Sequence, residues 1–376
     1  MPRAASRTIR FVVGVCLAVA VLMPVRFATG HPPSGIAVDG DGRVVFVEGG
    51  SWRLVGLRPE SGRIRPIAGD ASPPATEGSS PRPWMPHQVV RGPGGRLFTA
   101  DAGTGQVLEV DGDRVRPWTP DAGAPTGRPG AGGMPFTIDE RGAVWWARGL
   151  PGRRMEIVRQ APGGEAVVVA GGATGFVDGP AGVARFTDLD GGSMAWGPSG
   201  SLYVVDDGRA VRRVASDGTV KTIAGDRPGA GEPSADGFGR LGGIAVDARG
   251  TVFVVDRTHR CIRTIDAAGA FGVVERAGDA GDAAGAAGAE DAGEAGDRAD
   301  GPSDRDRNAG PVAVAVETQP VRLDAPTGVA VDPSGTVWVL DQPTGGGGRT
   351  IVVRIGRDGS VSRFDPQSAP TKRSPG

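Results

Sequence analysis

Charged side chains recur at one position of a repeated segment, and these residues are the first candidates for chemistry. Each of them ends an apolar run of about five residues: Glu48, Asp101, Arg148, Asp206, Asp256 and Asp341. If the runs are equivalent strands of one ring, their ends meet on one face, where carboxylates would bind a divalent cation such as calcium or a polar ligand. The competing interpretation is that each carboxylate caps the following turn by accepting backbone N–H bonds. Recurrence in almost every copy favours the cap, and Arg148 supplies the asymmetry that a functional site would need.

Two histidines and a tryptophan are further candidates on the same face. His87 begins a first strand and would lie at the mouth of the central channel, and His259 lies in the loop after Asp256. Imidazoles serve as metal ligands and general bases, although scattered histidines are more often surface or turn residues. Trp52 is a candidate aromatic for a binding face, and the alternative is that it packs between repeats.

The repeated segment is clearest from Leu241 to Arg276, where four short β-branched or apolar runs alternate with turn sequences such as Asp-Ala-Arg-Gly. Such runs predict four strands joined by hairpins. Six copies align on a turn glycine: Gly42, Gly95, Gly142, Gly200, Gly250 and Gly335. Four of the five spacings lie between 47 and 58 residues, which is the size of a propeller blade. We therefore predict an all-β fold, a six-bladed β-propeller of four-stranded antiparallel blades.

The long last spacing, 85 residues, contains a segment of different composition. Residues 277–311 hold nine acidic residues and three arginines among alanines and glycines, with no aromatic or β-branched residue. Such a segment cannot bury enough apolar surface to offset its ordering entropy. The sequence predicts one propeller over residues 31–376, with a disordered acidic insert between blades 5 and 6.

The first thirty residues resemble a secretory leader. Three arginines precede the apolar run from Phe11 to Leu22, and small residues follow at Ala28 and Gly30. This pattern predicts a signal peptide over residues 1–30, and an uncleaved N-terminal anchor is the alternative. Either way we expect a secreted or extracytoplasmic protein, which touches the membrane only through that segment. The formal net charge is −1, and removal of the leader with its four arginines would change it to about −5. This acidic balance argues against nucleic acid as a main partner, because phosphate binding needs a basic surface.

Several segments resemble NHL repeats. GIAVDARGTVFVVDRTHRCIRTID and GVAVDPSGTVWVLD carry the Gly-Ile-Ala-Val-Asp start, the turn glycine and the Val-Asp strand end, and Gly172 to Leu189 is similar to the linker of that family. The resemblance implies a closed propeller of the secreted bacterial type. The chain also resembles streptogramin lyases in strands such as Ala143-Val144-Trp145-Trp146, but a second catalytic histidine is absent where that family implies one. Gluconolactonase-like propellers use a central asparagine, whereas the only asparagine here, Asn308, lies in the acidic insert. The sequence therefore does not favour a gluconolactonase-like site.

These observations predict a binding module. We expect a protein, peptide, glycan or small ligand to bind, without chemistry and without a cofactor, on the channel-mouth face, which we define as the face where the second strands end. We also expect a monomer. The alternative is a propeller lyase or hydrolase of the streptogramin-lyase type, in which His87 acts with Asp101, Asp206 and Asp256 as general base or as ligands of a divalent metal.

Overall fold

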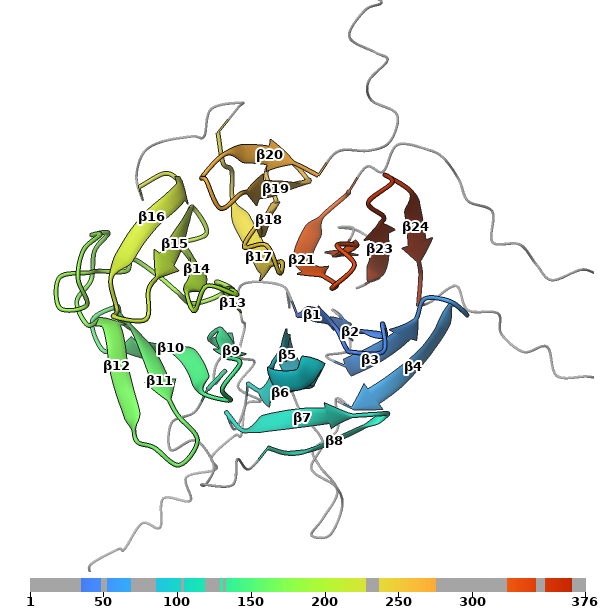
Figure 1. Ribbon diagram of the computed structural model, residues 1–376, viewed down its shortest axis with the longest axis horizontal. Helices are drawn as coiled ribbons and strands as arrows, with labels where there is room; N and C mark the ends of the chain where they lie inside the picture. The colour runs from blue at the N-terminus through green and yellow to red at the C-terminus, as the bar shows by residue number, and fades with distance from the viewer. Residues whose placement is uncertain are drawn as a thin grey trace, which may run out of the picture.

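The chain folds into a ring of six four-stranded antiparallel sheets, which confirms the predicted all-β six-bladed propeller (Figure 1). The computed structural model describes residues 35–48, 53–68, 86–102, 105–118, 129–130, 133–227, 237–274, 323–342 and 349–366. Within these ranges one complete helical element is present, the short 3-10 turn η1 (Pro93–Gly95). The predicted signal peptide, Trp52 and the acidic insert 277–311 lie outside the described residues.

The first three blades follow one another along the chain. Blade 1 comprises β1 (Ile36–Val38), β2 (Val44–Glu48), β3 (Arg53–Arg58) and β4 (Arg63–Ala68). Blade 2 comprises β5 (Pro86–Arg91), β6 (Leu97–Asp101), β7 (Val107–Asp111) and β8 (Arg114–Pro117). Blade 3 comprises β9 (Phe136–Ile138), β10 (Val144–Leu150), β11 (Arg154–Gln160) and β12 (Ala166–Gly171).

The last three blades repeat this order. Blade 4 comprises β13 (Met194–Trp196), β14 (Leu202–Asp206), β15 (Ala210–Val214) and β16 (Val220–Gly225). Blade 5 comprises β17 (Leu241–Val246), β18 (Val252–Asp256), β19 (Cys261–Ile265) and β20 (Phe271–Val273). Blade 6 comprises β21 (Pro326–Val331), β22 (Val337–Asp341), β23 (Ile351–Ile355) and β24 (Val361–Phe364).

The turn between the first and second strand is the most regular feature of the repeat. In blade 1, Asp39 Oδ1 accepts the backbone N–H groups of Asp41 (3.0 Å) and Arg43 (2.9 Å). All six aligned turn glycines have positive φ, from 69° to 85°, a conformation that glycine adopts without steric cost. These turns lie together on one face, which we call the hairpin face, and η1 of blade 2 is drawn toward the viewer there in Figure 1.

The first strands crowd together at the axis of the ring. A Cβ added to Gly35 would lie 2.5 Å from the backbone nitrogen of Val89 and 2.6 Å from Cα of Gln88 in blade 2. A Cβ on Gly243 would lie 2.7 Å from Cα of Gly328 in blade 6. The small residues at the start of these strands are therefore required by the close approach of neighbouring backbones.

Side chains packed between neighbouring blades hold the ring closed. Each buried cluster joins strands of two adjacent blades, and the cluster between blades 6 and 1 includes Val38, Phe46, Trp338 and Leu340. The described strands of every sheet come from one consecutive stretch of chain, so none of them is exchanged between blades. Side-chain packing therefore closes the ring between blades 6 and 1. No helix in the described part of the chain is long and apolar enough to cross a membrane.

Candidate functional site

The carboxylates at the ends of the second strands anchor the chain that leads into each blade. Asp206 is fully buried, and its Oδ1 accepts the backbone N–H groups of Thr187 (2.9 Å) and Asp188 (3.1 Å). In blade 6, Asp341 Oδ1 accepts those of Asp324 (3.0 Å) and Ala325 (2.7 Å). These oxygens cap backbone groups of their own blade, so they are not presented to a ligand in the channel.

Asp256 in blade 5 accepts hydrogen bonds from backbone and side-chain groups on this face. Its Oδ2 accepts the N–H of Gly239 (3.1 Å) and lies 2.8 Å from Nδ1 of His259, and its Oδ1 accepts the backbone N–H of His259 (3.0 Å). Arg263 Nε donates to the same Oδ2 at 3.3 Å. Burial alone would raise the pKa of Asp256, but these hydrogen bonds outweigh it and the pKa is lowered.

The low pKa of Asp256 predicts acid-sensitive folding. The carboxyl of an unfolded chain has a pKa of about 3.9, so a lower folded pKa gives stability that is present above about pH 4 and lost as the pH falls through the folded value. We expect Asp256→Asn to lose part of the pH dependence of the unfolding free energy, measured in urea between about pH 6 and pH 3. The exposed Asp41→Asn is the control, and an identical pH dependence in the two variants would contradict this role.

The remaining members of the predicted ring differ from one another. Glu48 is buried and its Oε2 accepts from Arg53 NH2 at 2.7 Å, whereas Asp101 is buried next to the β6–β7 turn. The prediction that the second strand of blade 3 ends at Arg148 is wrong, because β10 continues to Leu150. Arg148 pairs with Glu156 on the next strand at 2.6 Å. The guanidinium of Arg148 cannot accept hydrogen bonds from the backbone N–H groups of an incoming segment, as the aspartates of other blades do. Strands β10 and β11 remain paired beyond this position, as far as Leu150 and Arg154.

The two histidines do not converge on one site. His87 is only 3% exposed, inside β5, whereas His259 is partly exposed in the loop after β18 beside Asp256. No group of three or more His, Cys, Asp or Glu residues in the described ranges is arranged to hold a metal ion. The predicted set of His87, Asp101, Asp206 and Asp256 is therefore distributed over three blades, with each aspartate next to its own turn or incoming segment.

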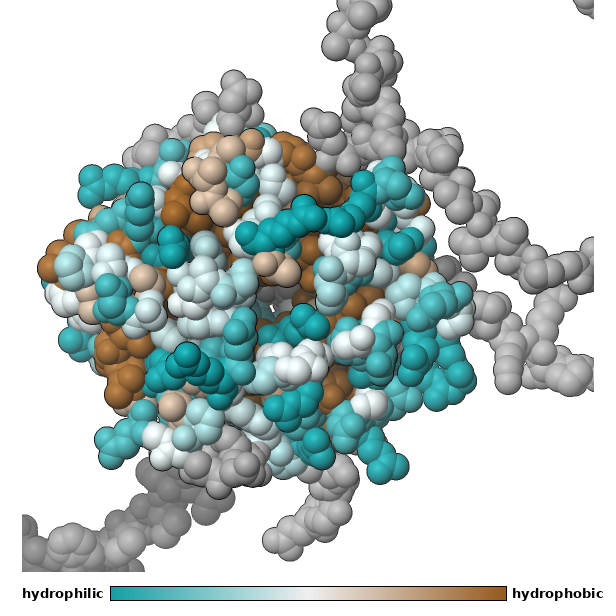
Figure 2. All heavy atoms as spheres, viewed as in Figure 1, coloured by the Kyte–Doolittle hydropathy of each residue, from teal (hydrophilic) through white to brown (hydrophobic). Residues whose placement is uncertain are grey.

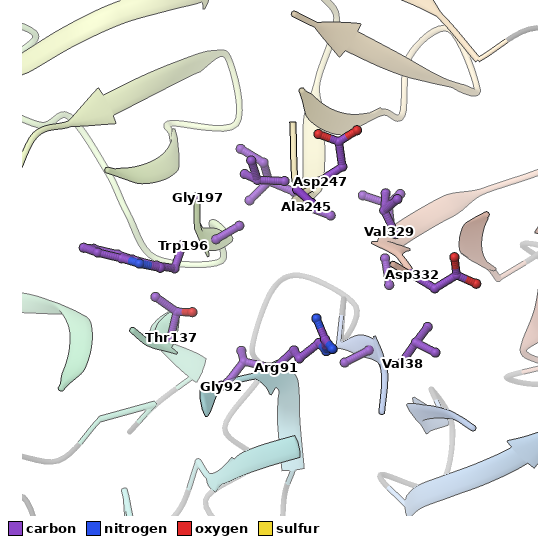
Figure 3. Close-up of a pocket in the computed structure, with 18 of the residues that line it drawn as sticks. Val38, Arg91, Gly92, Thr137, Trp196, Gly197, Ala245, Asp247, Val329 and Asp332 are labelled. Carbon is purple, nitrogen blue, oxygen red and sulfur yellow. The ribbon is translucent and has the colours of Figure 1, made fainter. Parts of the chain in front are cut away.

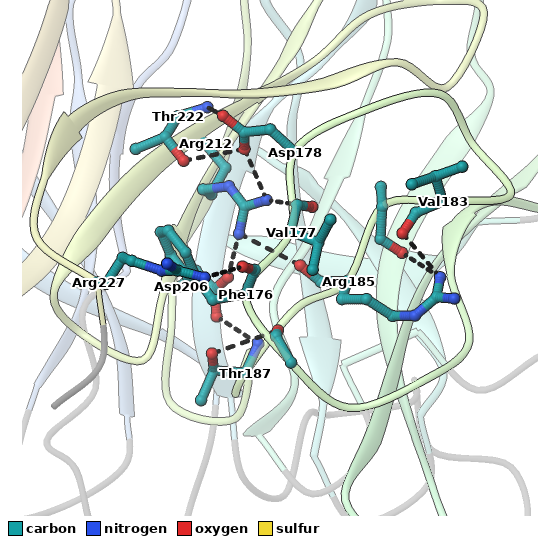
Figure 4. Close-up of polar contacts among 12 residues, drawn as sticks. Phe176, Val177, Asp178, Val183, Arg185, Thr187, Asp206, Arg212, Thr222 and Arg227 are labelled. Carbon is teal, nitrogen blue, oxygen red and sulfur yellow. Dashed lines mark hydrogen bonds and ion pairs between the residues drawn. The ribbon is translucent and has the colours of Figure 1, made fainter.

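The linker between blades 3 and 4 folds over β15 and is fixed by a buried arginine (Figure 4). The side chain of Arg212 is fully buried and bonds Asp206 (2.7 Å), Asp178 (2.9 Å) and the carbonyl oxygen of Val177 (2.9 Å). Its guanidinium lies 4.3 Å from the ring centroid of Phe176. Burial raises the pKa of Asp206 to about 6, although the backbone N–H of Asp188 and the charge of Arg212 act against it.

A cavity of about 330 Å³ lies on the axis and opens toward the hairpin face. All six first strands line it, together with residues of the turns that follow in blades 2 to 6, mostly with aliphatic side chains and backbone. Its volume falls at the lower end of the range for small-molecule sites, about 300–1,000 Å³. Figure 2 shows this face hollowed at its centre, with hydrophilic atoms around the rim. None of the predicted site residues within the described ranges lines this cavity.

Few polar side chains enter the wall of this cavity (Figure 3). Arg91 is exposed and extends from blade 2 along the wall toward Val38, and Thr137 contributes from blade 3. The carboxylates of Asp247 and Asp332 turn away from the centre. Asp332 Oδ1 accepts the backbone N–H of Thr336 at 2.9 Å. Burial would raise the pKa of Asp332, but its hydrogen bonds outweigh burial and lower it.

Gln88 lies in β5, two residues before Val90, which lines the cavity. It is buried, its Oε1 accepts the N–H of Phe136 in blade 3 at 3.1 Å, and its Nε2 donates to the carbonyl of Gly192 before blade 4 at 3.4 Å. One side chain thus ties three blades together at the axis. The equivalent positions of blades 1, 5 and 6 are Gly35, Gly243 and Gly328, so these blades have no side chain that could make the same contacts.

Sequence reasoning missed this cavity, although one signal for it was present. At the position of Arg91, the other five copies carry apolar residues: Val38, Ile138, Trp196, Val246 and Val331. Arg91 is thus the one charged residue at an aligned position that is apolar in the other five copies. It indicates that blade 2 differs from the other blades at the end of its first strand. The carboxylates recur in the repeat, whereas Arg91 departs from it and lines the cavity.

Comparison with known proteins supports the fold. No family model matches the chain, and no curated protein matches it. A structure of a protein of unknown function from Bacteroides thetaiotaomicron has 14% identity and a TM-score of 0.53, covering 88% of this chain and 70% of its own.

Two structures of named enzymes are similar at a lower level. Virginiamycin B lyase from Staphylococcus aureus has 12% identity, a TM-score of 0.45 and coverages of 90% of this chain and 85% of its own. A gluconolactonase from Xanthomonas campestris has 14% identity, a TM-score of 0.48 and coverages of 83% and 84%. Likeness at these identities concerns the fold alone.

Proposed function

We propose that this protein is an extracytoplasmic NHL-type propeller that binds a small ligand, or the end of a larger one, in its axial cavity without chemistry. The leader-like first thirty residues support the location, and the GIAVD-type repeats support the NHL assignment. The observation that carries the binding function is the cavity itself. Its wall combines aliphatic side chains from six blades with a few polar side chains, among them the guanidinium of Arg91 and the hydroxyl of Thr137, which suits recognition.

The channel-mouth face is the less favoured of the two faces for this function. The described carboxylates there are engaged with backbone N–H groups or arginines, as Asp206, Asp256 and Asp341 illustrate. A ligand binding to them would have to replace bonds that hold the incoming segments. The hairpin face needs no such replacement, because the cavity exists in the folded ring.

One observation favours a hydrolase or lyase as the second candidate. His259 lies 2.8 Å from Asp256 through Nδ1 and is 25% exposed, and a carboxylate that orients an imidazole is typical of general bases. If this pair is catalytic, the protein should hydrolyse an activated ester such as p-nitrophenyl acetate, and His259→Gln should abolish that turnover. Equal background rates with the variant and the wild type would remove this candidate.

The binding proposal predicts that filling the cavity abolishes ligand binding. Ala245 lines the cavity and points toward its centre in Figure 3, so a phenyl ring at this position would occupy the space. We expect Ala245→Phe to weaken, by about tenfold or more, the binding of molecules found in a fragment screen by ligand-observed NMR. Melting temperatures of both proteins establish that the variant is folded.

The matched control places the same ring outside the cavity. Ala268 is exposed in the β19–β20 turn of the same blade, and Ala268→Phe should keep every fragment that the wild type binds. If the fragments bind Ala245→Phe as tightly as the control, or if no fragment binds the wild type, the axial cavity is not the binding site.

A further inference from the structure

The outer strand of blade 3 differs from the outer strands of the other blades. Every blade has one hydrogen-bonding edge at its fourth strand, and such edges pair with other chains unless charged residues, proline or short length prevent it. The described outer strands read RIRPIA, RVRP, AVVVAG, VKTIAG, FGV and VSRF. Among these six, β12 alone combines six residues with no charge and no proline.

The side chains of β12 are also unusually exposed for their type. Val167 and Val168 are 51% and 50% exposed. Val183, in the linker that follows this blade, is 51% exposed as well. Figure 2 shows hydrophobic atoms at the rim of the ring over β12. β-branched residues with no charge between them are the composition that favours strand pairing between molecules.

The geometry limits the open part of this edge. The turn between β15 and β16 approaches the far end of β12, where a Cβ on Gly218 would overlap the carbonyl oxygen of Val169. The open part is therefore Ala166 to Val168, preceded by the exposed Glu165. A short open edge of this kind supports a weak, concentration-dependent association.

We propose that β12 pairs antiparallel with β12 of a second copy of this chain, giving a twofold dimer through blade 3. A twofold axis pairs residue i of one strand with residue j of the other, and j with i. Centred on Val167, the open part of β12 pairs valine with valine on the axis and Ala166 with Val168 on either side, with no charged residue, whereas β4, β8, β16 and β24 each carry at least one arginine or lysine into such a pairing. The strand is thus compatible with its own copy in a way that those four edges are not.

The test is the molar mass of the purified chain by sedimentation equilibrium over a dilution series. We expect a dimer at high concentration that dissociates on dilution. Val168→Lys should raise the dissociation constant about tenfold or more, because it places two ammonium groups diagonally across the paired strands on one face and an ammonium group opposite Ala166 of the second copy. The control is Val273→Lys, which adds the same charge at an exposed valine of β20 and should leave the dimer intact.

Three outcomes would overturn the proposal. One is a wild-type chain that stays monomeric at every concentration, which would leave the edge for an extended peptide. The second is a dimer that Val168→Lys does not weaken. The third is a dimer that Val273→Lys weakens equally. Hydrogen exchange supplies an independent readout, since the amides of Ala166 to Val168 should exchange more slowly in the dimer than after dilution.

Discussion

Replacing Arg212 with methionine should be the most destabilising single substitution that we predict, at about 3–5 kcal/mol. The side chain of Arg212 is fully buried and bonds Asp206, Asp178 and the carbonyl oxygen of Val177. Removing its charge leaves Asp206 buried beside an apolar group, where the carboxylate must take up a proton or stay charged without its cation. Either outcome destabilises the folded state relative to the wild type, in which the charge of Asp206 is paired with that of Arg212.

The melting temperature is the direct measurement for this variant. A loss of this size corresponds to roughly 6–20 °C in a domain of this size. Hydrogen exchange should accelerate in the linker around Val177, because Arg212 holds the linker to β15. The control is Arg213→Met, since Arg213 is exposed and its Nε donates to Ser201 Oγ at 3.0 Å. Equal melting temperatures for the two variants would show that the buried arginine does not stabilise the fold.

Adding one methyl group to Gly35 should destabilise the ring by about 3 kcal/mol, at the upper end of the usual cost of overpacking. The new Cβ would lie 2.5 Å from the backbone nitrogen of Val89 and 2.6 Å from Cα of Gln88. These are backbone atoms of the neighbouring first strand, so no side chain can rotate to make room. Blades 1 and 2 would have to separate at the axis.

The matched control for this substitution lies in the same blade. Nothing lies within 4 Å of the position that a Cβ would take on Gly40, so Gly40→Ala should change the unfolding free energy by less than about 1 kcal/mol. Urea unfolding of both variants measures the difference. If Gly35→Ala proves as stable as Gly40→Ala, the first strands are not in the close backbone contact on which the account of the axis depends.

The repeat could be predicted from the sequence because each blade is built from local hairpins. An aspartate, a turn glycine and a β-branched strand occur within fourteen residues of each other, as in Gly243 to Asp256. The first departure from this pattern also has a local cause. Gly92 replaces the turn aspartate in blade 2, because a Cβ there would lie 2.7 Å from the ring of Phe98. Such pairs of residues lie within one hairpin and can be found by aligning the copies.

The roles of the carboxylates depend on contacts that the sequence order does not reveal. Asp341 caps Asp324 and Ala325, which precede it by 17 and 16 residues and approach it only in the folded blade. Arg212 likewise collects acceptors from β14 and from the linker. In the sequence, an aspartate that caps backbone N–H groups cannot be distinguished from one that faces a ligand. The distinction requires the position of the segment that leads into the blade, which the folded structure provides.

The axial cavity was beyond sequence reasoning for a different reason. Its wall is formed by the ends of six strands that are spread along the chain between Ile36 and Val331. Gln88 shows the difficulty: it replaces a glycine of the repeat, and only the structure shows that it bonds Phe136 and Gly192 near the axis. The expectation that ligands bind on the channel-mouth face remains a prediction.

The central claim is that the axial cavity on the hairpin face is the ligand site. A crystal structure of the protein soaked with the tightest fragment from the screen tests it most directly. We predict density for the fragment between Ala245 and Val329, within reach of Arg91. Density beside Asp256 or Asp341 on the channel-mouth face, with the cavity empty, would contradict the claim.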